Sequence, residues 1–124
     1  MRILVVSDTH KNVNSLRTIL LAQPTAELVI HLGDGEDDVA LLKPSFPEKM
    51  FLQVRGNCDW GSNLPDFGTY TAEGVKIFYT HGHLYGVKSG LYLMNPGSAG
   101  YGAPSYGTLD ITPQGIVTNI VKLP

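Results

Sequence analysis

Four polar clusters in this sequence carry carboxylate, carboxamide and imidazole groups, the side chains that proteins use to bind divalent metals. They are Asp8-Thr9-His10, Gly33-Asp34, Gly56-Asn57-Cys58-Asp59 and His81-Gly82-His83. Oxygen and imidazole donors favour hard or borderline ions such as Mn²⁺, Fe²⁺ or Zn²⁺, whereas thiolate-rich sites favour softer ions. The clusters therefore predict a divalent metal site, provided that the fold brings them together.

Each cluster also has an ordinary structural explanation when it is considered alone. Asp8 can cap the helix that follows it, and Gly33-Asp34 can form a turn. Asn57 can likewise cap or turn, and a histidine such as His81 at a strand end is more often hydrogen-bonded than bound to metal. Four such clusters in order, each at a predicted strand end, make chance the weaker explanation.

The hydrophobic pattern predicts the elements that position these clusters. Short apolar runs, at 3–6, 27–32 and 50–54, end at the first three clusters and are typical of buried parallel strands. Helical spacing predicts two connecting helices, over 12–23 and from Glu36 onwards. Because the carboxyl ends of parallel strands lie along one sheet edge, where ligands bind, this β-α-β-α-β order predicts that the clusters converge.

The second half of the chain is typical of antiparallel hairpins. The predicted strand pairs are 67–71 with 75–80, and 106–111 with 116–121, each joined by a glycine-containing turn. Parallel strands followed by hairpins predict an α/β fold with a core of two packed β-sheets, a β-sandwich flanked by helices. A chain of 124 residues suffices for one domain, so we expect residues 1–124 to form a single one.

The composition argues against several classes of protein. A formal net charge of −2 gives no basic face for nonspecific nucleic-acid binding. The apolar run at 3–6 is too short for a signal peptide or a membrane span. Cys58 is the one cysteine, which excludes an internal disulfide framework and favours a reducing compartment. We therefore expect a cytoplasmic protein without a membrane partner, in which Cys58 is a small buried residue.

The order of the motifs resembles that of the calcineurin-like metallophosphoesterases. The sequence has D-x-H at 8–10, G-D at 33–34, G-N-x-D at 56–59, T-H-G-H at 80–83 and N-P-G-S at 95–98. The match covers nearly the whole chain, and Cys58 makes it most similar to the compact YfcE-type branch of metal-dependent phosphodiesterases. The retromer scaffold subunit Vps29 has a similar fold and belongs to the same superfamily.

The resemblance implies the metallo-dependent phosphatase fold, with its α/β/β/α layers. It also implies a phosphoesterase that uses two divalent ions. Mn²⁺ is the metal we expect, and Fe²⁺, Ni²⁺ and Zn²⁺ are the alternatives. Asp8 and His10 would bind one ion, Asn57 and His81 the other, and Asp34 would bridge both. A hydroxide shared by the ions would attack the phosphorus of a small phosphoester, with Asp34, Asn57 and His81 as the catalytic residues. The residues expected to surround the site or face the substrate are His31, Cys58, Asp59, His83, Asn95, Gly97 and Ser98.

One part of the family pattern is missing from this sequence. Between T-H-G-H and N-P-G-S the family has a helix and a strand ending in G-H-x-H, whereas here the chain runs from 86–90 almost directly into 91–94. All four histidines precede that point, so each ion would lack one histidine ligand and bind more water. Either this crossover unit is deleted, or the complete protein carries a segment that this sequence lacks.

The missing segment leaves two further interpretations open. The protein could be a non-catalytic binding module of the same fold, although retention of all five ligand residues argues against that. It could also be a homo-oligomer whose neighbour completes the site, because apolar surface uncovered by the lost unit favours self-association.

The resemblance also bears on the substrate. Many relatives carry a histidine at the position of Cys58. A thiol with a pKa of about 8.5 is a poor acid, which favours diesters and activated esters as substrates.

Overall fold

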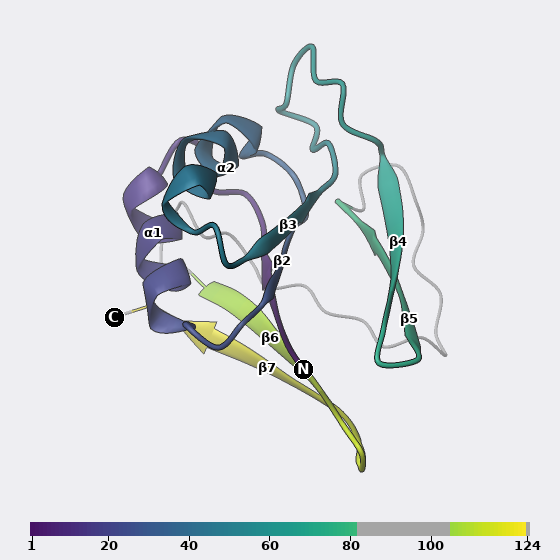
Figure 1. Cartoon of the computed structure of the whole chain (residues 1–124). Coiled ribbons are helices and arrows are strands. Elements are labelled where there is room, and N and C mark those ends of the chain that lie inside the picture. The colour runs from purple at the N-terminus through teal and green to yellow at the C-terminus, as the bar shows by residue number, and fades with distance from the viewer. Residues whose placement is uncertain (82–104, 124) are drawn as a thin grey trace.

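The computed structural model describes residues 1–81 and 105–123 (Figure 1). Their elements, in chain order, are β1 (Arg2–Val6), α1 (Val13–Ala22), β2 (Leu28–His31), α2 (Glu36–Leu42), the 3₁₀ helix η1 (Lys43–Ser45), β3 (Met50–Gln53), β4 (Phe67–Ala72), β5 (Val75–Thr80), β6 (Ser105–Thr112) and β7 (Gly115–Lys122). Each predicted strand and helix is present, with ends within about two residues of those expected from sequence, as assignments of element ends ordinarily vary.

The strands form two sheets. The larger sheet has the order β3-β2-β1-β6-β7, in which β1, β2 and β3 are parallel and β6 and β7 are antiparallel to their neighbours. The hairpin of β4 and β5 forms a separate two-stranded sheet. The predicted α/β fold with two β-sheets is therefore confirmed.

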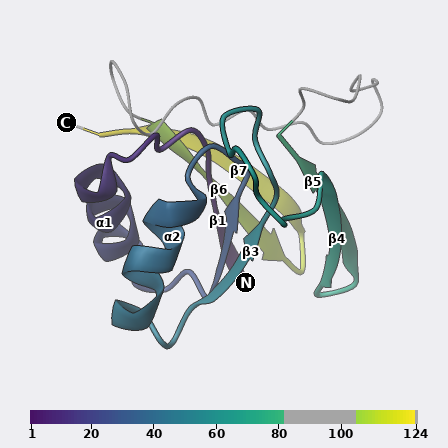
Figure 2. The same ribbon diagram turned by 90° about the horizontal axis from the view of Figure 1, so that it is seen from above.

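Strand β1 lies at the centre of the larger sheet and is buried on both of its faces. Leu4 and Val6 pack into a core with α1 and α2, whereas Ile3 and Val5 pack into a second core on the side of the β4-β5 hairpin. Burial on both faces explains why the strand is a continuous apolar run rather than an alternating one. Seen from above, the helices cover one face of the large sheet and the hairpin lies on the other (Figure 2).

The described helices form one outer layer, on the large sheet. Over residues 1–81 and 105–123, no helix covers the outer face of the β4-β5 hairpin, so the second helical layer expected of a helix-flanked sandwich is not seen in these ranges. Within the same ranges, no helix is long and apolar enough to cross a membrane. That residues 1–124 form a single domain stays a prediction.

Parallel register aligns the carboxyl ends of the first three strands. Val6 lies opposite His31, and His31 lies opposite Gln53. The loops that follow these three residues therefore leave the sheet at the same edge, and they are the loops that carry the first three polar clusters.

Candidate metal centre

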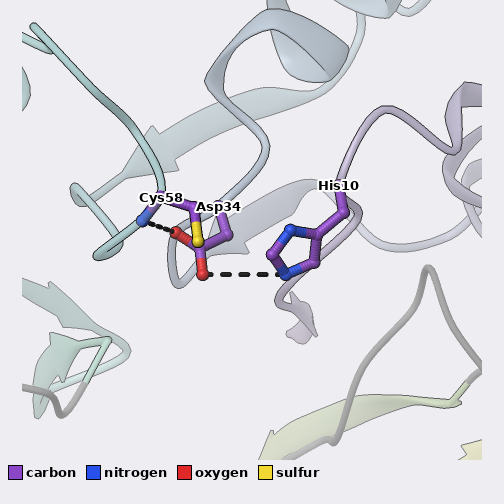
Figure 3. A group of neighbouring side chains, drawn as sticks. All are labelled: His10, Asp34 and Cys58. Carbon is purple, nitrogen blue, oxygen red and sulfur yellow. Dashed lines mark hydrogen bonds and ion pairs between the residues drawn. The ribbon is translucent and has the colours of Figure 1, made fainter.

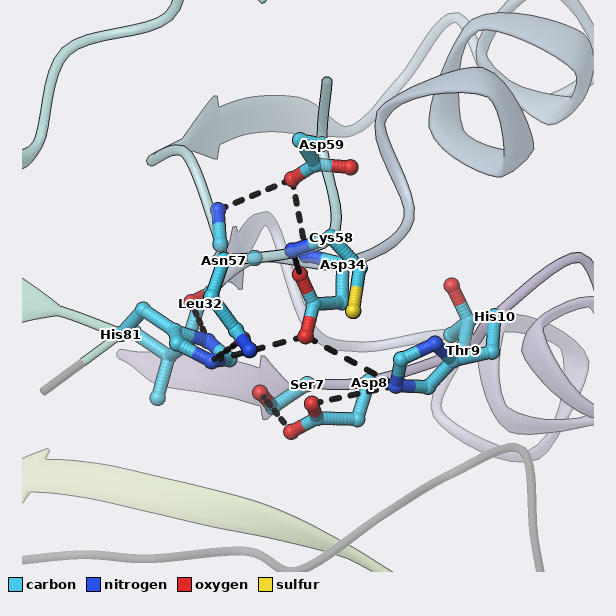
Figure 4. Close-up of polar contacts among 12 residues, drawn as sticks. Ser7, Asp8, Thr9, His10, Leu32, Asp34, Asn57, Cys58, Asp59 and His81 are labelled. Atoms are coloured by element: carbon cyan, nitrogen blue, oxygen red, sulfur yellow. Dashed lines mark hydrogen bonds and ion pairs between the residues drawn. The ribbon is translucent and has the colours of Figure 1, made fainter. Parts of the chain in front are cut away.

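The polar residues predicted as metal ligands lie together at this edge of the sheet (Figure 4). Asp8 and His10 follow β1, Asp34 follows β2, Asn57 follows β3, and His81 follows β5 on the second sheet. The cluster therefore spans both sheets and joins four loops.

The loops after β1 and β2 are held together by backbone hydrogen bonds. The N–H of Asp8 donates to the carbonyl of Gly33, and the N–H of His10 to that of Asp34, both at 2.9 Å. Asp8, His10 and Asp34 have φ angles of 56°, 46° and 61°, in the left-handed region that non-glycine residues seldom adopt. Such conformations cost about 1–3 kcal/mol each and gather at functional sites. The fold thus holds three of the expected ligands in a strained geometry.

The donor atoms of the cluster are spaced as the ligands of shared ions would be. His10 Nε2 lies 3.3 Å from Asp8 Oδ1 and 3.7 Å from Asp34 Oδ2. On the other side of Asp34, His81 Nε2 lies 3.5 Å from the same Oδ2 and 3.0 Å from Asn57 Oδ1. Two ligands that are each about 2.1 Å from one ion lie about 3–3.5 Å apart. The residues present therefore fit divalent ions on either side of Asp34 with small adjustments.

A backbone contact indicates which ring nitrogen of neutral His81 carries the proton. Its Nδ1 lies 2.8 Å from the carbonyl oxygen of Leu32, which can only accept a hydrogen bond, so Nδ1 carries the proton. In a neutral ring, Nε2 then carries a lone pair, and because Asn57 Oδ1 and Asp34 Oδ2 also have lone pairs, the three atoms together suit a bound cation. Second-shell contacts of this kind orient metal-binding histidines.

The carboxyl groups of Asp8 and Asp34 are close enough to influence each other's ionisation. Burial raises the pKa of Asp34, and the neighbouring Asp8 raises it further. The hydrogen bond from the Cys58 N–H lowers this pKa, but it does not outweigh the other two effects. Burial also opposes ionisation of Asp8, but hydrogen bonds from Ser7 (2.6 Å) and with Asp34 keep its pKa below its usual value. A cation bound between the two carboxyl groups would favour the ionised form of both.

Asp59 joins the loops after β2 and β3. Its carboxylate accepts hydrogen bonds from the N–H groups of Asp34 at 2.8 Å, Gly56 at 2.9 Å and Glu36 at 3.4 Å. The carboxylate of Asp59 thus fixes the loops that carry Asp34 and Asn57 relative to each other.

His31, expected near the site, is 1% exposed and lies beneath it. Its Nδ1 accepts from the Gly33 N–H at 3.1 Å, so its Nε2–H donates to the Thr9 hydroxyl at 3.1 Å, and that hydroxyl donates to Asp38. Asp38 also accepts from the Lys11 N–H at 3.0 Å. This chain of hydrogen bonds fixes the loop that carries His10 to α2.

Thr9 and Asp38 also hold the site together, a role that the motifs did not indicate for either residue. Asp38 resembles any acidic residue in the first turn of a helix, and its 3% exposure is set by tertiary packing. Its one sequence signal is its place four residues after Asp34 of the G-D motif.

Burial lowers the pKa of His31 to about 4, although the nearby Asp59 and Asp38 oppose this. The folded chain therefore keeps His31 neutral at pH values at which the unfolded chain protonates it. Stability from this residue is complete above the unfolded pKa of about 6.5 and falls as the pH drops toward 4, by on the order of 3 kcal/mol in total.

We expect the His31→Gln variant to lose less stability than wild type between pH 7 and pH 4, because glutamine does not titrate. Urea unfolding followed by circular dichroism at several pH values measures this, since Trp60, the one tryptophan, is 90% exposed and a poor fluorescence probe. Parallel stability curves for the two proteins would contradict the assignment.

Cys58 is exposed, so the expectation that it is a small buried residue is wrong. Partial desolvation and the carboxylates of Asp34, Asp59 and Asp8 raise the pKa of its thiol. The protonated thiol is a weak nucleophile, which argues against covalent catalysis by this residue.

An open cleft of about 530 Å³ leads to the cluster. It is lined by His10, Lys11, Asp34, Gly35, Glu36, Asp37, Asp38, Cys58, Asp59 and Trp60. Carboxylates outnumber the single lysine, so an anionic phosphoester would be repelled unless cations neutralised the site. The other residues expected around the site, His83, Asn95, Gly97 and Ser98, lie outside the described residues.

The sequence of this chain matches those of known metallophosphoesterases. Residues 1–91 match the calcineurin-like phosphoesterase superfamily domain, and the chain belongs to this superfamily. A probable metallophosphoesterase of Bacillus subtilis, YsnB, is 37% identical over 93 residues, which make up 73% of this chain and 52% of that protein. The chain thus spans about half the length of this curated relative.

Solved structures of three proteins share the fold. An archaeal phosphodiesterase has a TM-score of 0.77 and 22% identity, with 99% of this chain and 100% of that one covered. The phosphoesterase Yfce from E. coli has a TM-score of 0.67 and 23% identity, with 89% and 88% covered. Vps29 from Entamoeba histolytica, complexed with zinc, has a TM-score of 0.66 and 18% identity, with 98% and 99% covered. At these identities the likeness shows the fold alone.

Proposed function

We propose that this protein is a metal-dependent phosphodiesterase whose site is formed by Asp8, His10, Asp34, Asn57 and His81. The observation that carries the proposal is the convergence of acceptor atoms from four loops on the Asp34 carboxylate, at 3.5 Å from His81 and 3.7 Å from His10. Asp34 would bridge two divalent ions, with Asp8 and His10 on one side and Asn57 and His81 on the other. Bound ions of this kind supply an activated water nucleophile and neutralise charge on the phosphoryl oxygens.

The chain's own groups define the remaining roles. The Asn57 carboxamide lies beside His81 and opposite the carboxylates, so its N–H group can also donate to a phosphate oxygen. Cys58 lines the cleft, but its raised pKa makes its thiol a poor proton donor to a leaving group. Weak acid assistance favours diesters and esters with good leaving groups over alkyl monoesters.

The substrate in this proposal is a small phosphoester, and the metal is Mn²⁺ or one of Fe²⁺, Ni²⁺ and Zn²⁺. The archaeal structural neighbour is a phosphodiesterase by its title, which agrees with the proposed reaction. A cytoplasmic location, the absence of nucleic-acid and membrane partners, and self-association through surface uncovered by the missing crossover unit also belong to the proposal.

The missing G-H-x-H motif favours a second candidate, a binding module that holds metal without catalysis. Vps29 shows that the fold also occurs in a protein named for vacuolar protein sorting. In that case the chain would bind divalent ions but leave phosphoesters intact. Hydrolysis measured on the metal-loaded chain therefore distinguishes the two candidate functions.

The experiment uses chain stripped of metal by a chelator and then reloaded with Mn²⁺, Fe²⁺, Ni²⁺ or Zn²⁺. We expect hydrolysis of bis(p-nitrophenyl) phosphate only after reloading, and a lower rate with p-nitrophenyl phosphate. The Glu48→Gln variant is the matched control, because it removes an exposed carboxylate outside the cleft. Hydrolysis that survives complete removal of metal would overturn the proposal, and metal binding without hydrolysis would favour the binding module.

A further inference from the structure

Cys58 is close to two of the expected metal ligands. One ligand atom from each of His10, Asp34 and Cys58 lies within 4.8 Å of the others, and these three form one of the two candidate ligand groups among the described residues. Figure 3 shows the sulfur beside the Asp34 carboxylate, with the His10 ring facing both. The second candidate group, Asp8, Asp34 and His81, shares Asp34 with the first.

We propose that the Cys58 thiolate is a ligand of the ion held by Asp8, His10 and Asp34, and that it replaces the histidine that the missing G-H-x-H motif would have supplied. The inference rests on the proposed function, because it requires the metal centre to form. It gives this ion four protein ligands, and hydrolysis would require a further, fifth position for water.

The position of Cys58 is fixed by contacts on both sides. Its N–H donates to Asp34 Oδ1 at 2.7 Å, which leaves Asp34 Oδ2 facing the two histidines. The next residue, Asp59, accepts from the N–H groups of Gly56 and Asp34. These bonds hold the backbone of Cys58 against the carboxylate, so only the side-chain torsion remains to be set when the sulfur binds.

The exposure of the Cys58 thiol favours a role as a metal ligand over a role in packing. The thiol is exposed and lines the cleft together with His10 and Asp34, so it fills no part of either hydrophobic core. As the sulfur binds, the S–H bond breaks, its proton passes to water and a sulfur–metal bond forms, with no change of oxidation state.

A thiolate ligand changes the metal preference of the site. Sulfur selects softer ions, so Zn²⁺ and Co²⁺ gain affinity relative to Mn²⁺. Removing Cys58 should therefore weaken zinc binding by about tenfold or more. Loss of a residue that merely supports a metal ligand already lowers metal affinity by about tenfold or more. Manganese binding should change much less.

The test is titration of metal-free chain with Co²⁺, read by absorption spectroscopy. Because Cys58 is the one cysteine of the sequence, a near-ultraviolet sulfur-to-cobalt charge-transfer band can come from no other residue. We expect this band in wild type and in Glu48→Gln, and its loss in Cys58→Ser while the visible bands of bound cobalt remain.

Each outcome of the titration decides between the two proposals. Bound cobalt in wild type without the charge-transfer band would overturn the ligand role of Cys58 and leave the metal centre intact. No bound cobalt at all would contradict both proposals. As a second readout, Zn²⁺ should slow modification of the thiol by Ellman's reagent in wild type but not in Asp34→Asn, and equal rates with and without Zn²⁺ would overturn the inference.

Discussion

The Asp34→Asn variant is expected to lose at least about 10³-fold in kcat/KM for the hydrolysis of bis(p-nitrophenyl) phosphate. Loss of the shared carboxylate removes several kcal/mol of transition-state stabilisation, and each 1.36 kcal/mol is about tenfold in rate. The carboxylate is the one group that lies within 3.7 Å of both His10 and His81 among the described contacts.

The same substitution should leave the metal-free fold intact. Asparagine keeps an oxygen that accepts from the Cys58 N–H, and it removes a carboxyl whose pKa burial and Asp8 raise. A raised pKa means that the ionised carboxyl costs the folded chain stability relative to the unfolded chain. We therefore expect Asp34→Asn to be at least as stable as wild type in chelator, by urea unfolding. Activity within tenfold of wild type in a folded variant would rule out the bridging role of Asp34.

The second large effect is expected from Gly56→Ala. A Cβ at this position would lie 2.1 Å from Asp34 Oδ1 and 2.5 Å from the Asp34 backbone nitrogen. Because the second of these atoms is backbone, the clash cannot be relieved by a side-chain rotation. Overpacking of this kind costs about 1–3 kcal/mol in stability, and it displaces the carboxylate from the histidines. Metal affinity, measured by equilibrium dialysis, should fall together with activity.

Gly61→Ala is the matched control for this change. Gly61 has a φ of 71°, but nothing lies within 4 Å of a Cβ added there. Alanine should cost only the strain of a left-handed backbone, about 1–2 kcal/mol, and leave metal affinity unchanged. If Gly61→Ala and Gly56→Ala lowered metal affinity equally, the close approach of Gly56 to Asp34 would not be the cause.

The elements of the fold could be predicted from sequence because their signals are local. Apolar runs such as Ile3–Val6 mark strands buried on both faces, and the turn at Glu73-Gly74 marks a hairpin. The gathering of Asp8 and Asp34 followed from one rule, that parallel strands end at the same edge of a sheet. By contrast, the pairing of β6 with β1 joins residues about a hundred positions apart in the chain. The hydrophobic pattern does not indicate the register of such a distant pair.

His31 and Asp59 were expected near the site, but the contacts of the supporting residues could not be predicted because they are tertiary hydrogen bonds. Asp59 follows Asn57 in the motif, yet its function is to accept from the backbone of Asp34. Asp38 carries the ordinary signature of a helix start, although it is buried against Thr9. The exposure of Cys58 is likewise a property of the cleft, and composition alone favoured the opposite expectation.

The central claim, that Asp34 joins two metal ions at this site, is tested most directly by electron paramagnetic resonance of the chain saturated with Mn²⁺. The account predicts the signal of two exchange-coupled manganese ions in wild type, and only isolated manganese in Asp34→Asn. An isolated signal from wild type at saturating manganese would contradict the two-ion site.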